Sequence, residues 1–286
     1  MAMHTILKEP LFLNGFNHQY HAEIDRGWLS IKSMWNGRAT YLLENGRLTV
    51  DDDCYLILND QQPYTIHIEG KETIESFCIF FPARWADDVL RTFMTPKDTL
   101  LDEIEGDTAV SFYDVLHRHD LLVTPILQRL RQAHKQGDVA QGWQTEMLHY
   151  LLAAMLQVQR QVHQEAAKLP AARTTTRKEL YRRLHIGRDF ICDNLQESLS
   201  LEQIAQHAAL SPYHFLRSFK KLFGQTPHTY LTEQRIKHAQ HLLAQTDIPI
   251  TDICLAVGFQ SLGSFSTLFQ RYSGCSPRQY RQQFSN

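Results

Sequence analysis

The 286-residue sequence lacks the short motifs by which many enzymes are recognised. It contains no GxSxG nucleophile motif, no glycine-rich phosphate loop and no HExxH metal motif. Its five cysteines are scattered and never spaced as CxxC: Cys54, Cys78, Cys192, Cys254 and Cys275. We therefore expect a protein that is not an enzyme, holds no cofactor or metal, and keeps its cysteines reduced and buried.

Long apolar runs are missing as well. No window approaches the ~18 consecutive apolar residues that span a bilayer, and residues 1–10 lack the pattern of a secretory signal. We therefore expect a cytoplasmic protein. The chain is 43% hydrophobic and 21% charged, and it is long enough for two domains with separate cores.

Charge is distributed unevenly along the chain. Residues 171–286 carry 14 lysines and arginines against 8 acidic residues, a net charge of +6. Residues 1–170 carry 15 against 23, a net charge of −8. This split fits a DNA-binding module joined to a domain that does not adhere to DNA.

The N-terminal part divides into a β-rich and a helical portion. Residues 1–82 read as short strands joined by tight turns, which is typical of a β-sandwich or small barrel. Asn45-Gly46 is the strongest hairpin signal among them. Over residues 83–165 the apolar period becomes helical, with helices expected at 84–93 and 121–134.

A long apolar stripe follows in this helical portion. Its residues recur at helical spacing: Trp143, Met147, Tyr150, Leu151, Ala154 and Val158. Such a stripe either packs on its own domain or joins two copies of the chain, so a homodimer contact stays open as a hypothesis. The pattern then fades, which predicts a linker over 166–179 and a separate domain over 180–286.

The domain over 180–286 contains one pattern twice, at an offset of 49 to 50 residues. Ile204, Phe215, Phe219, Gly224, Pro227 and Tyr230 return as Ile253, Phe265, Phe269, Gly274, Pro277 and Tyr280. Each copy predicts a helix–turn–helix, over about 201–222 and 250–272, and a long helix joins the two. A capping box at Ser200 and Ser-Pro or Thr-Pro pairs mark the helix starts.

The second helix of each unit buries phenylalanines and exposes a polar face that could meet DNA. In the first unit this face comprises Tyr213, His214, Arg217, Lys220 and Lys221. Arg217 can read a guanine bidentately, and the two lysines suit phosphates. In the second unit the helix opens at Ser261, and its face comprises Leu262, Gly263, Ser266, Thr267, Gln270 and Arg271. Without a long donor near its start, the second helix should add position and affinity more than base specificity.

At these residues the sequence resembles the AraC/XylS family of bacterial transcription regulators. The resemblance covers about residues 184–284 and includes the runs Leu201-Glu202-Gln203-Ile204-Ala205, Ile250-Thr251-Asp252-Ile253, Gly258-Phe259 and Ser276-Pro277. It implies a seven-helix domain whose two recognition helices enter successive major-groove faces ~34 Å apart. By the same analogy Tyr213, Leu216 and Arg217 face bases in the first unit, and Leu262, Gly263, Ser266 and Thr267 do so in the second. A basic residue that is common in the family at the position of Thr267 is absent.

The resemblance also suggests roles for the first 165 residues. Many members of the family carry a cupin-like β-domain that senses a small molecule, followed by helices that dimerise, and activation through RNA polymerase is their commoner mode. An effector pocket would then be lined by aromatic residues: Trp28, Trp35, Tyr41, Tyr55, Tyr64, His67 and Phe77. The alternative is that these rings simply fill the barrel.

Three hypotheses follow. The leading one is a sequence-specific DNA-binding regulator, expected to be an activator, with a sensing and dimerising N-terminal domain. The second is a protein that binds a ligand or a partner protein but not DNA. The third is a metal-dependent cupin enzyme, and it is the weakest, because His18, His21 and Glu23 do not match the HxH-plus-Glu ligand pattern.

Overall fold

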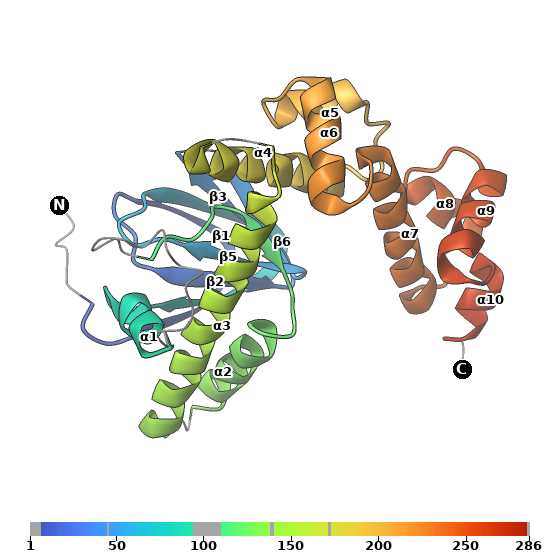
Figure 1. Ribbon diagram of the computed structural model, residues 1–286. Coiled ribbons are helices and arrows are strands. Elements are labelled where there is room, and N and C mark those ends of the chain that lie inside the picture. Colours follow the sequence, from blue (N-terminus) through green and yellow to red (C-terminus); the bar gives the residue numbers. More distant parts are fainter. Residues whose placement is uncertain (1–6, 45, 94–109, 138–139, 171–172, 285–286) are drawn as a thin grey trace. The chain divides into compact units, whose positions relative to one another are not determined.

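The computed structural model describes residues 7–44, 46–93, 110–137, 140–170 and 173–284. The chain forms two compact units, which comprise residues 1–165 and 166–286. All described strands lie in the first unit, and the second is helical (Figure 1). Leu43 pairs with Gly46 across the predicted hairpin, although Asn45 itself lies outside the described residues.

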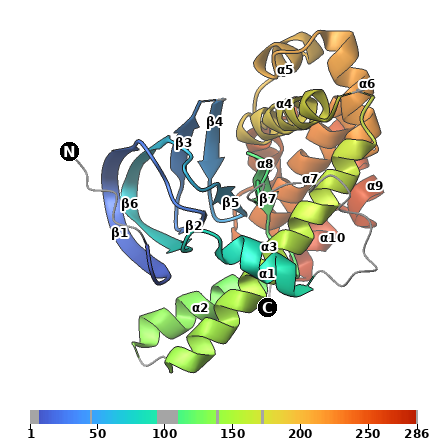
Figure 2. The ribbon, with the colours of Figure 1, turned by 60° about the vertical axis from the view of Figure 1, so that its left-hand side comes forward.

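The N-terminal unit is built on one antiparallel sheet that curls into a nearly closed barrel (Figure 2). Its described strands are β1 (Leu11–Ile24), β2 (Ser30–Trp35), β3 (Ala39–Leu43), β4 (Gly46–Val50), β5 (Cys54–Leu58), β6 (Tyr64–Phe80) and β7 (Leu116–Arg118). Hydrogen-bonded neighbours run in the order β4-β3-β6-β2-β5-β7, and β1 pairs with β6. The β-rich character predicted for residues 1–82 is confirmed.

The long strand β6 organises the barrel. Its first half pairs with β3 and its second half with β2, while β1 pairs along both halves. Because successive side chains of a strand point to opposite faces, Tyr64 and Ile66 face the interior whereas Glu75 and Phe77 face outward. The interior core takes side chains from each of β2 to β7, which is the sign of a curled sheet.

Helix α2 (Thr124–Gln136) packs on the outer face of β6. The buried carboxylate of Glu75 accepts hydrogen bonds from Arg131 and Lys135, at 2.8 Å from Arg131 Nε and 2.7 Å from Lys135 Nζ. Burial opposes ionisation, but these donors hold the pKa of Glu75 below its usual value. The Arg131 guanidinium also lies 3.9 Å from the centre of the Trp35 ring. These contacts fix α2 to the sheet.

The helical portion of this unit differs in detail from the prediction. Its helices are α1 (Trp85–Phe93), α2 and α3 (Gln141–Ala167). Helix α2 begins at Thr124 and not at residue 121, because Pro125 fits only the first turn of a helix. The strand β7 was not predicted, because three residues are too few to show a period. Its His117 is buried, and the ring stacks on Tyr55 of β5 at 5.2 Å.

The described part of the C-terminal unit contains the seven helices that the family resemblance implies. They are α4 (Thr174–Asp193), α5 (Leu201–His207), α6 (Pro212–Phe223), α7 (Pro227–Gln245), α8 (Ile250–Ala256), α9 (Leu262–Ser273) and α10 (Pro277–Gln282). The predicted linker over 166–179 is therefore too long, since α4 begins inside it. The first turn of α4 is exposed, and its buried face starts at Leu180. The sequence therefore shows no apolar period that would predict the beginning of this helix.

Close packing and local caps define this unit. Gly187 of α4 lies against Phe215 of α6, where an added Cβ would come within 2.5 Å of the ring. The predicted capping box at Ser200 is present, and Ser211, Thr226 and Ser276 cap helices whose first turn contains proline. Among the described helices, none is long and apolar enough to cross a membrane.

Candidate nucleic-acid interface and ligand pocket

Helix α6 is the recognition helix expected in the first helix–turn–helix. The Ser211 hydroxyl caps its start, and Gly224 ends it in the left-handed region at φ 73°. Phe215 and Phe219 are fully buried. The opposite face is open to solvent: Tyr213, His214, Arg217, Lys220 and Lys221 are exposed, and Leu216 is half-buried. This face presents three cations and one aromatic ring that are free to meet a partner.

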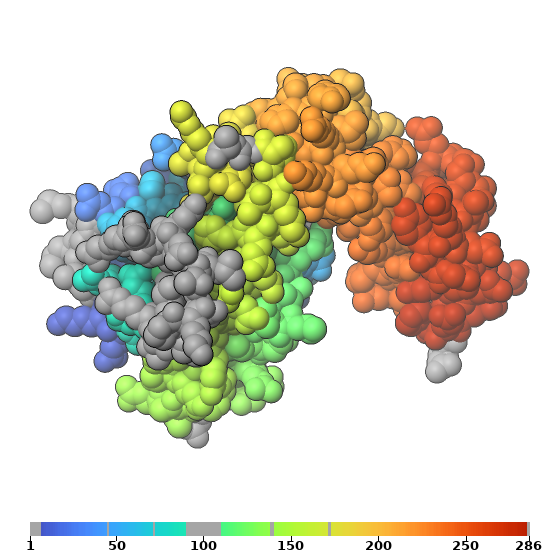
Figure 3. Space-filling view, in the orientation of Figure 1, coloured from blue at the N-terminus to red at the C-terminus, as the bar shows by residue number. Residues whose placement is uncertain are grey.

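Helix α9 repeats this construction in the second unit. Ser261 caps it, Phe265 and Phe269 are fully buried, and Gly274 ends it at φ 76°. Its other face carries Leu262, Gly263, Thr267, Gln270 and Arg271, all exposed, and Ser266, half-buried. The Thr267 hydroxyl donates to the Gly263 carbonyl at 3.0 Å, and Arg271 in the last turn is the single cation of α9. The two recognition faces thus differ in charge. In the space-filling view of Figure 3, α6 belongs to the orange part of the surface and α9 to the red part.

A single arginine of α7 braces the two helix–turn–helix units within this domain. Arg235 donates to the carbonyls of Leu195 and Glu197, just before α5, with Nε and Nη2 each 2.7 Å from their acceptors. The turn of the second unit lies against the same guanidinium, because a Cβ on Gly258 would meet Arg235 at 2.9 Å and the Leu195 carbonyl at 2.5 Å. The brace therefore joins the segment before the first helix–turn–helix to the turn of the second one.

Sequence reasoning missed this brace. The contacts of Arg235 lie 38 to 40 residues away along the chain, and no periodicity reports them. Gly258 offered a partial signal, since it is part of the Gly258-Phe259 motif. Its φ of +89° requires glycine, whereas the equivalent position of the first unit holds Ala209 at φ 52°.

Comparisons with known proteins concern this C-terminal unit. Residues 204–283 match a family described as a helix-turn-helix domain. The melibiose operon regulatory protein of Escherichia coli is 37% identical over 93 residues, which are 32% of this chain and 31% of that protein. The HTH-type transcriptional activator RhaS of Escherichia fergusonii is 42% identical over 90 residues, 32% of each chain. The alignments thus span about a third of the length of these curated relatives.

A solved structure is also similar. The crystal structure of a transcriptional regulator with an AraC-type DNA-binding domain, from Chromobacterium violaceum, shares 33% identity and a TM-score of 0.35, covering 36% of this chain and 93% of that one. The matches to the helix-turn-helix family and to named regulators define the class: the C-terminal unit is a helix-turn-helix DNA-binding domain. It belongs to the AraC/XylS family, as its resemblance predicts.

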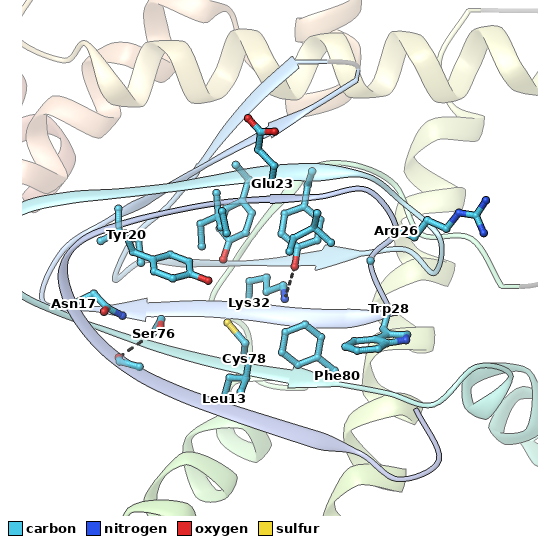
Figure 4. Close-up of a pocket in the computed structure, with 18 of the residues that line it drawn as sticks. Leu13, Asn17, Tyr20, Glu23, Arg26, Trp28, Lys32, Ser76, Cys78 and Phe80 are labelled. Atoms are coloured by element: carbon cyan, nitrogen blue, oxygen red, sulfur yellow. Dashed lines mark hydrogen bonds between the residues drawn. The ribbon is translucent and has the colours of Figure 1, made fainter. Parts of the chain in front are cut away.

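The barrel of the N-terminal unit encloses a cavity of about 540 Å³, within the usual size of small-molecule pockets. Of the seven effector residues expected from the sequence, it is lined by three: Trp28, Tyr41 and Tyr64. The lining surface is mostly apolar, and the other lining residues come from β1, β2, β6 and the segment between β1 and β2 (Figure 4).

The remaining four expected residues lie elsewhere, and strand alternation explains their positions. Trp35 and Phe77 belong to the outer face, close to α2. Tyr55 donates a hydrogen bond to Asp120 at 2.7 Å. His67 is exposed, with its Nδ1 3.0 Å from that of His21. Selecting residues by aromatic type, without their register, mixed the two faces of the sheet.

Lys32 of β2 is the unexpected member of the pocket. Its side chain is buried, with 1% exposed, and its Nζ lies 3.4 Å from the Tyr64 hydroxyl and 3.6 Å from the centre of the Phe80 ring. Burial lowers the pKa of its amine to about 8, despite an opposing influence of Cys78. The sequence offered no clear signal, because Lys32 lies in a strand that also contains Ser30 and Ser33.

Two other groups of predicted residues are placed as follows. In the dimerisation stripe, Leu151, Ala154 and Val158 are buried within the chain itself, Trp143 and Met147 are half-buried, and Tyr150 is 50% exposed. The buried three pack on their own chain, which was the first of the two interpretations. In the part of the chain that the structure describes, no three His, Cys, Asp or Glu side chains are grouped to hold a metal ion.

We predict that Gly258→Ala destabilises the C-terminal unit more than Gly274→Ala. Both glycines have a left-handed φ, at +89° and +76°, but nothing lies within 4 Å of a Cβ on Gly274. The control variant should lose about 1 kcal/mol from backbone strain alone. Gly258→Ala should lose about 1–3 kcal/mol more, because its Cβ overlaps the brace. Urea denaturation of the full chain measures both, and equal losses would contradict the proposed brace.

We also predict that Lys32→Met stabilises the N-terminal unit at pH 7. The pKa of the amine falls from 10.5 to about 8 on folding, so holding the proton costs about 3 kcal/mol below pH 8. The unfolded chain retains its proton up to pH 10.5, so the wild type recovers this stability as the pH rises from 8 to 10.5. The stability gap between variant and wild type should therefore close over that window.

Urea denaturation at several pH values checks this second prediction. The matched control is Lys168→Met, which removes an exposed lysine and should change stability little at any pH. A gap for Lys32→Met that stays constant up to pH 10.5 would show that the buried amine is not the cause.

Proposed function

We propose that this chain is a sequence-specific transcription regulator that binds DNA through α6 and α9 and responds to a small molecule held in its N-terminal barrel. The observation that carries the proposal is the repeated construction of α6 and α9. Each is a capped helix of 12 residues with two fully buried phenylalanines and an exposed polar face. A helix of this kind inserts its open face into a major groove.

The two recognition helices take different shares of the work in this proposal. Arg217 of α6 reads a base, while Lys220 and Lys221 neutralise phosphates. Tyr213, 74% exposed, meets a thymine methyl or a phosphate. Helix α9 offers Arg271 and short polar side chains, so it supplies position and affinity on the next groove face.

The proposal extends to the rest of the assembly. The barrel is the cupin-like sensor, the protein acts in the cytoplasm as a regulator and not an enzyme, and it activates transcription through RNA polymerase. A homodimer places two copies on DNA. Its interface uses the exposed side of α3, such as Tyr150, because three residues of the expected stripe are buried.

The first experiment is a mobility-shift assay of the full chain with fragments from upstream of its own gene. We expect a shift that weakens steeply with salt, since phosphate contacts release counterions. If no fragment is shifted at low salt, DNA binding by this chain is abandoned and a protein partner for the helical unit becomes the better interpretation.

We predict that Arg217→Ala and Lys221→Ala differ in kind. Loss of Arg217 should relax the preference for one base pair by about 1–3 kcal/mol, because a bidentate contact is removed. Loss of Lys221 should weaken binding to all sequences alike and reduce the salt slope by about one. Binding measured against a set of single-base operator variants at several salt concentrations separates the two. Equal loss of specificity from both would contradict the assigned roles.

A further inference from the structure

The cavity of the barrel contains a buried cation that no carboxylate of the described residues pairs with. The Lys32 ammonium points into it between the Tyr64 and Phe80 rings (Figure 4). In the part of the chain that the structure describes, no Asp or Glu forms an ion pair with Lys32. The π face of Phe80 compensates part of the desolvation, as cation–π contacts do. A buried charge left in this state is costly unless something else neutralises it.

The charged residues at the rim do not supply this neutralisation. Glu23, Asp25 and Arg26 line the cavity at its rim, and the Glu23 and Arg26 side chains point away from Lys32 (Figure 4). Asp25 is exposed, and the Glu23 side chain is 76% exposed. Among the described lining residues, Lys32 is therefore the charged group that is buried.

A second buried polar group in the same place has a thiol as its polar neighbour. The Tyr41 hydroxyl is fully buried, and no nitrogen or oxygen among the described residues bonds to it. It lies beside the Cys78 thiol, which also neighbours Lys32. Burial raises the pKa values of Tyr41, Tyr64 and Cys78, so all three stay neutral donors while the amine is charged. The Lys32 ammonium and the Tyr41 hydroxyl thus both neighbour the Cys78 thiol inside the cavity.

We infer that the cavity binds an amphipathic small molecule with a single carboxylate, held by the Lys32 ammonium and the Tyr41 hydroxyl. The apolar body of this molecule lies against the aliphatic and aromatic lining residues: Leu13, Ala22, Ile24, Trp28, Ile66 and Phe80. This inference names the ligand class for the proposed sensor, and its biological meaning rests on that proposed function. The binding of a carboxylate to the cavity does not depend on the proposed function.

The lining decides between ligand classes. A neutral sugar needs hydrogen-bond partners over most of its surface, whereas most of the surface of this cavity is apolar. A phosphate monoester would bring close to two negative charges to one buried cation, which leaves charge uncompensated. One carboxylate matches the one ammonium, and its second oxygen can accept from the hydroxyl.

The test uses the full chain and two pairs of probes in titration calorimetry. Octanoate and 4-phenylbutyrate carry the carboxylate on an aliphatic and an aromatic body, and their primary amides are neutral controls of the same shape. We expect at least one carboxylate to bind about tenfold or more tightly than its amide. Its affinity should fall about tenfold per pH unit above pH 8, as the amine loses its proton, whereas that of the amide should not.

Variants attribute the effect to the pocket. Lys32→Met should remove the preference for carboxylate over amide, and Tyr41→Phe should weaken carboxylate binding by a smaller factor. Lys168→Met, an exposed lysine, should leave both affinities unchanged. The melting temperature of each variant without ligand shows whether its fold is intact.

Three results overturn the inference: neither carboxylate binds, each amide binds as tightly as its acid, or the preference survives Lys32→Met. None of them depends on DNA, so they are distinguishable from failure of the proposed regulator. If the chain binds carboxylates but shifts no DNA, the ligand inference stands and the proposed regulator is rejected. If the chain shifts DNA but shows no preference for carboxylates, the proposed regulator stands and the ligand inference is rejected.

Discussion

In the proposed function, the reading of DNA depends on a fixed arrangement of two helices, and the Arg235 brace restricts their relative rotation. Helix α7 has 19 residues and so is about 28 Å long, close to one turn of the duplex. A helix of that length sets the spacing but not the rotation of what it carries. The Arg235 guanidinium donates to two carbonyls before α5 and lies against Gly258. Both helix–turn–helix units are therefore held by the same side chain. Two planar hydrogen bonds from one fork restrict rotation better than a single contact does.

Because the two helix–turn–helix units are held rigidly, their difference in charge affects how each contributes to binding. In the proposed function, the cations of α6 concentrate sequence reading and salt-dependent affinity in the first helix–turn–helix, while α9 has one arginine in its last turn. If the units moved independently, α9 would bind DNA too weakly to matter. Held on the same body, it is delivered to the next groove face at no further cost in translational freedom. A weakly charged second helix is therefore compatible with a useful contribution to binding.

Sequence reasoning succeeded where the signal is local. The caps at Ser200, Ser211 and Ser276 and the repeated phenylalanines lie within a few residues of the helices they define, so α5, α6 and α10 could be located closely. It failed where the answer depends on distant partners. Whether an aromatic residue faces the cavity is set by register with a neighbouring strand, and so Phe77 was selected together with Tyr64. The Arg235 contacts and the short strand β7 likewise depend on residues that are distant in the sequence.

The buried ammonium links the stability of the barrel to its occupancy. A cost of about 3 kcal/mol is a substantial part of the 5–15 kcal/mol that folded domains usually have in reserve. An anion that binds the folded barrel, and not the unfolded chain, offsets this cost and adds stability that grows with its concentration. Such a group is hard to explain as packing, because a methionine fills the same space without the charge. With this buried cation in the cavity, the stability of the N-terminal unit rises when a ligand of opposite charge binds. A sensing domain requires such a dependence on its ligand.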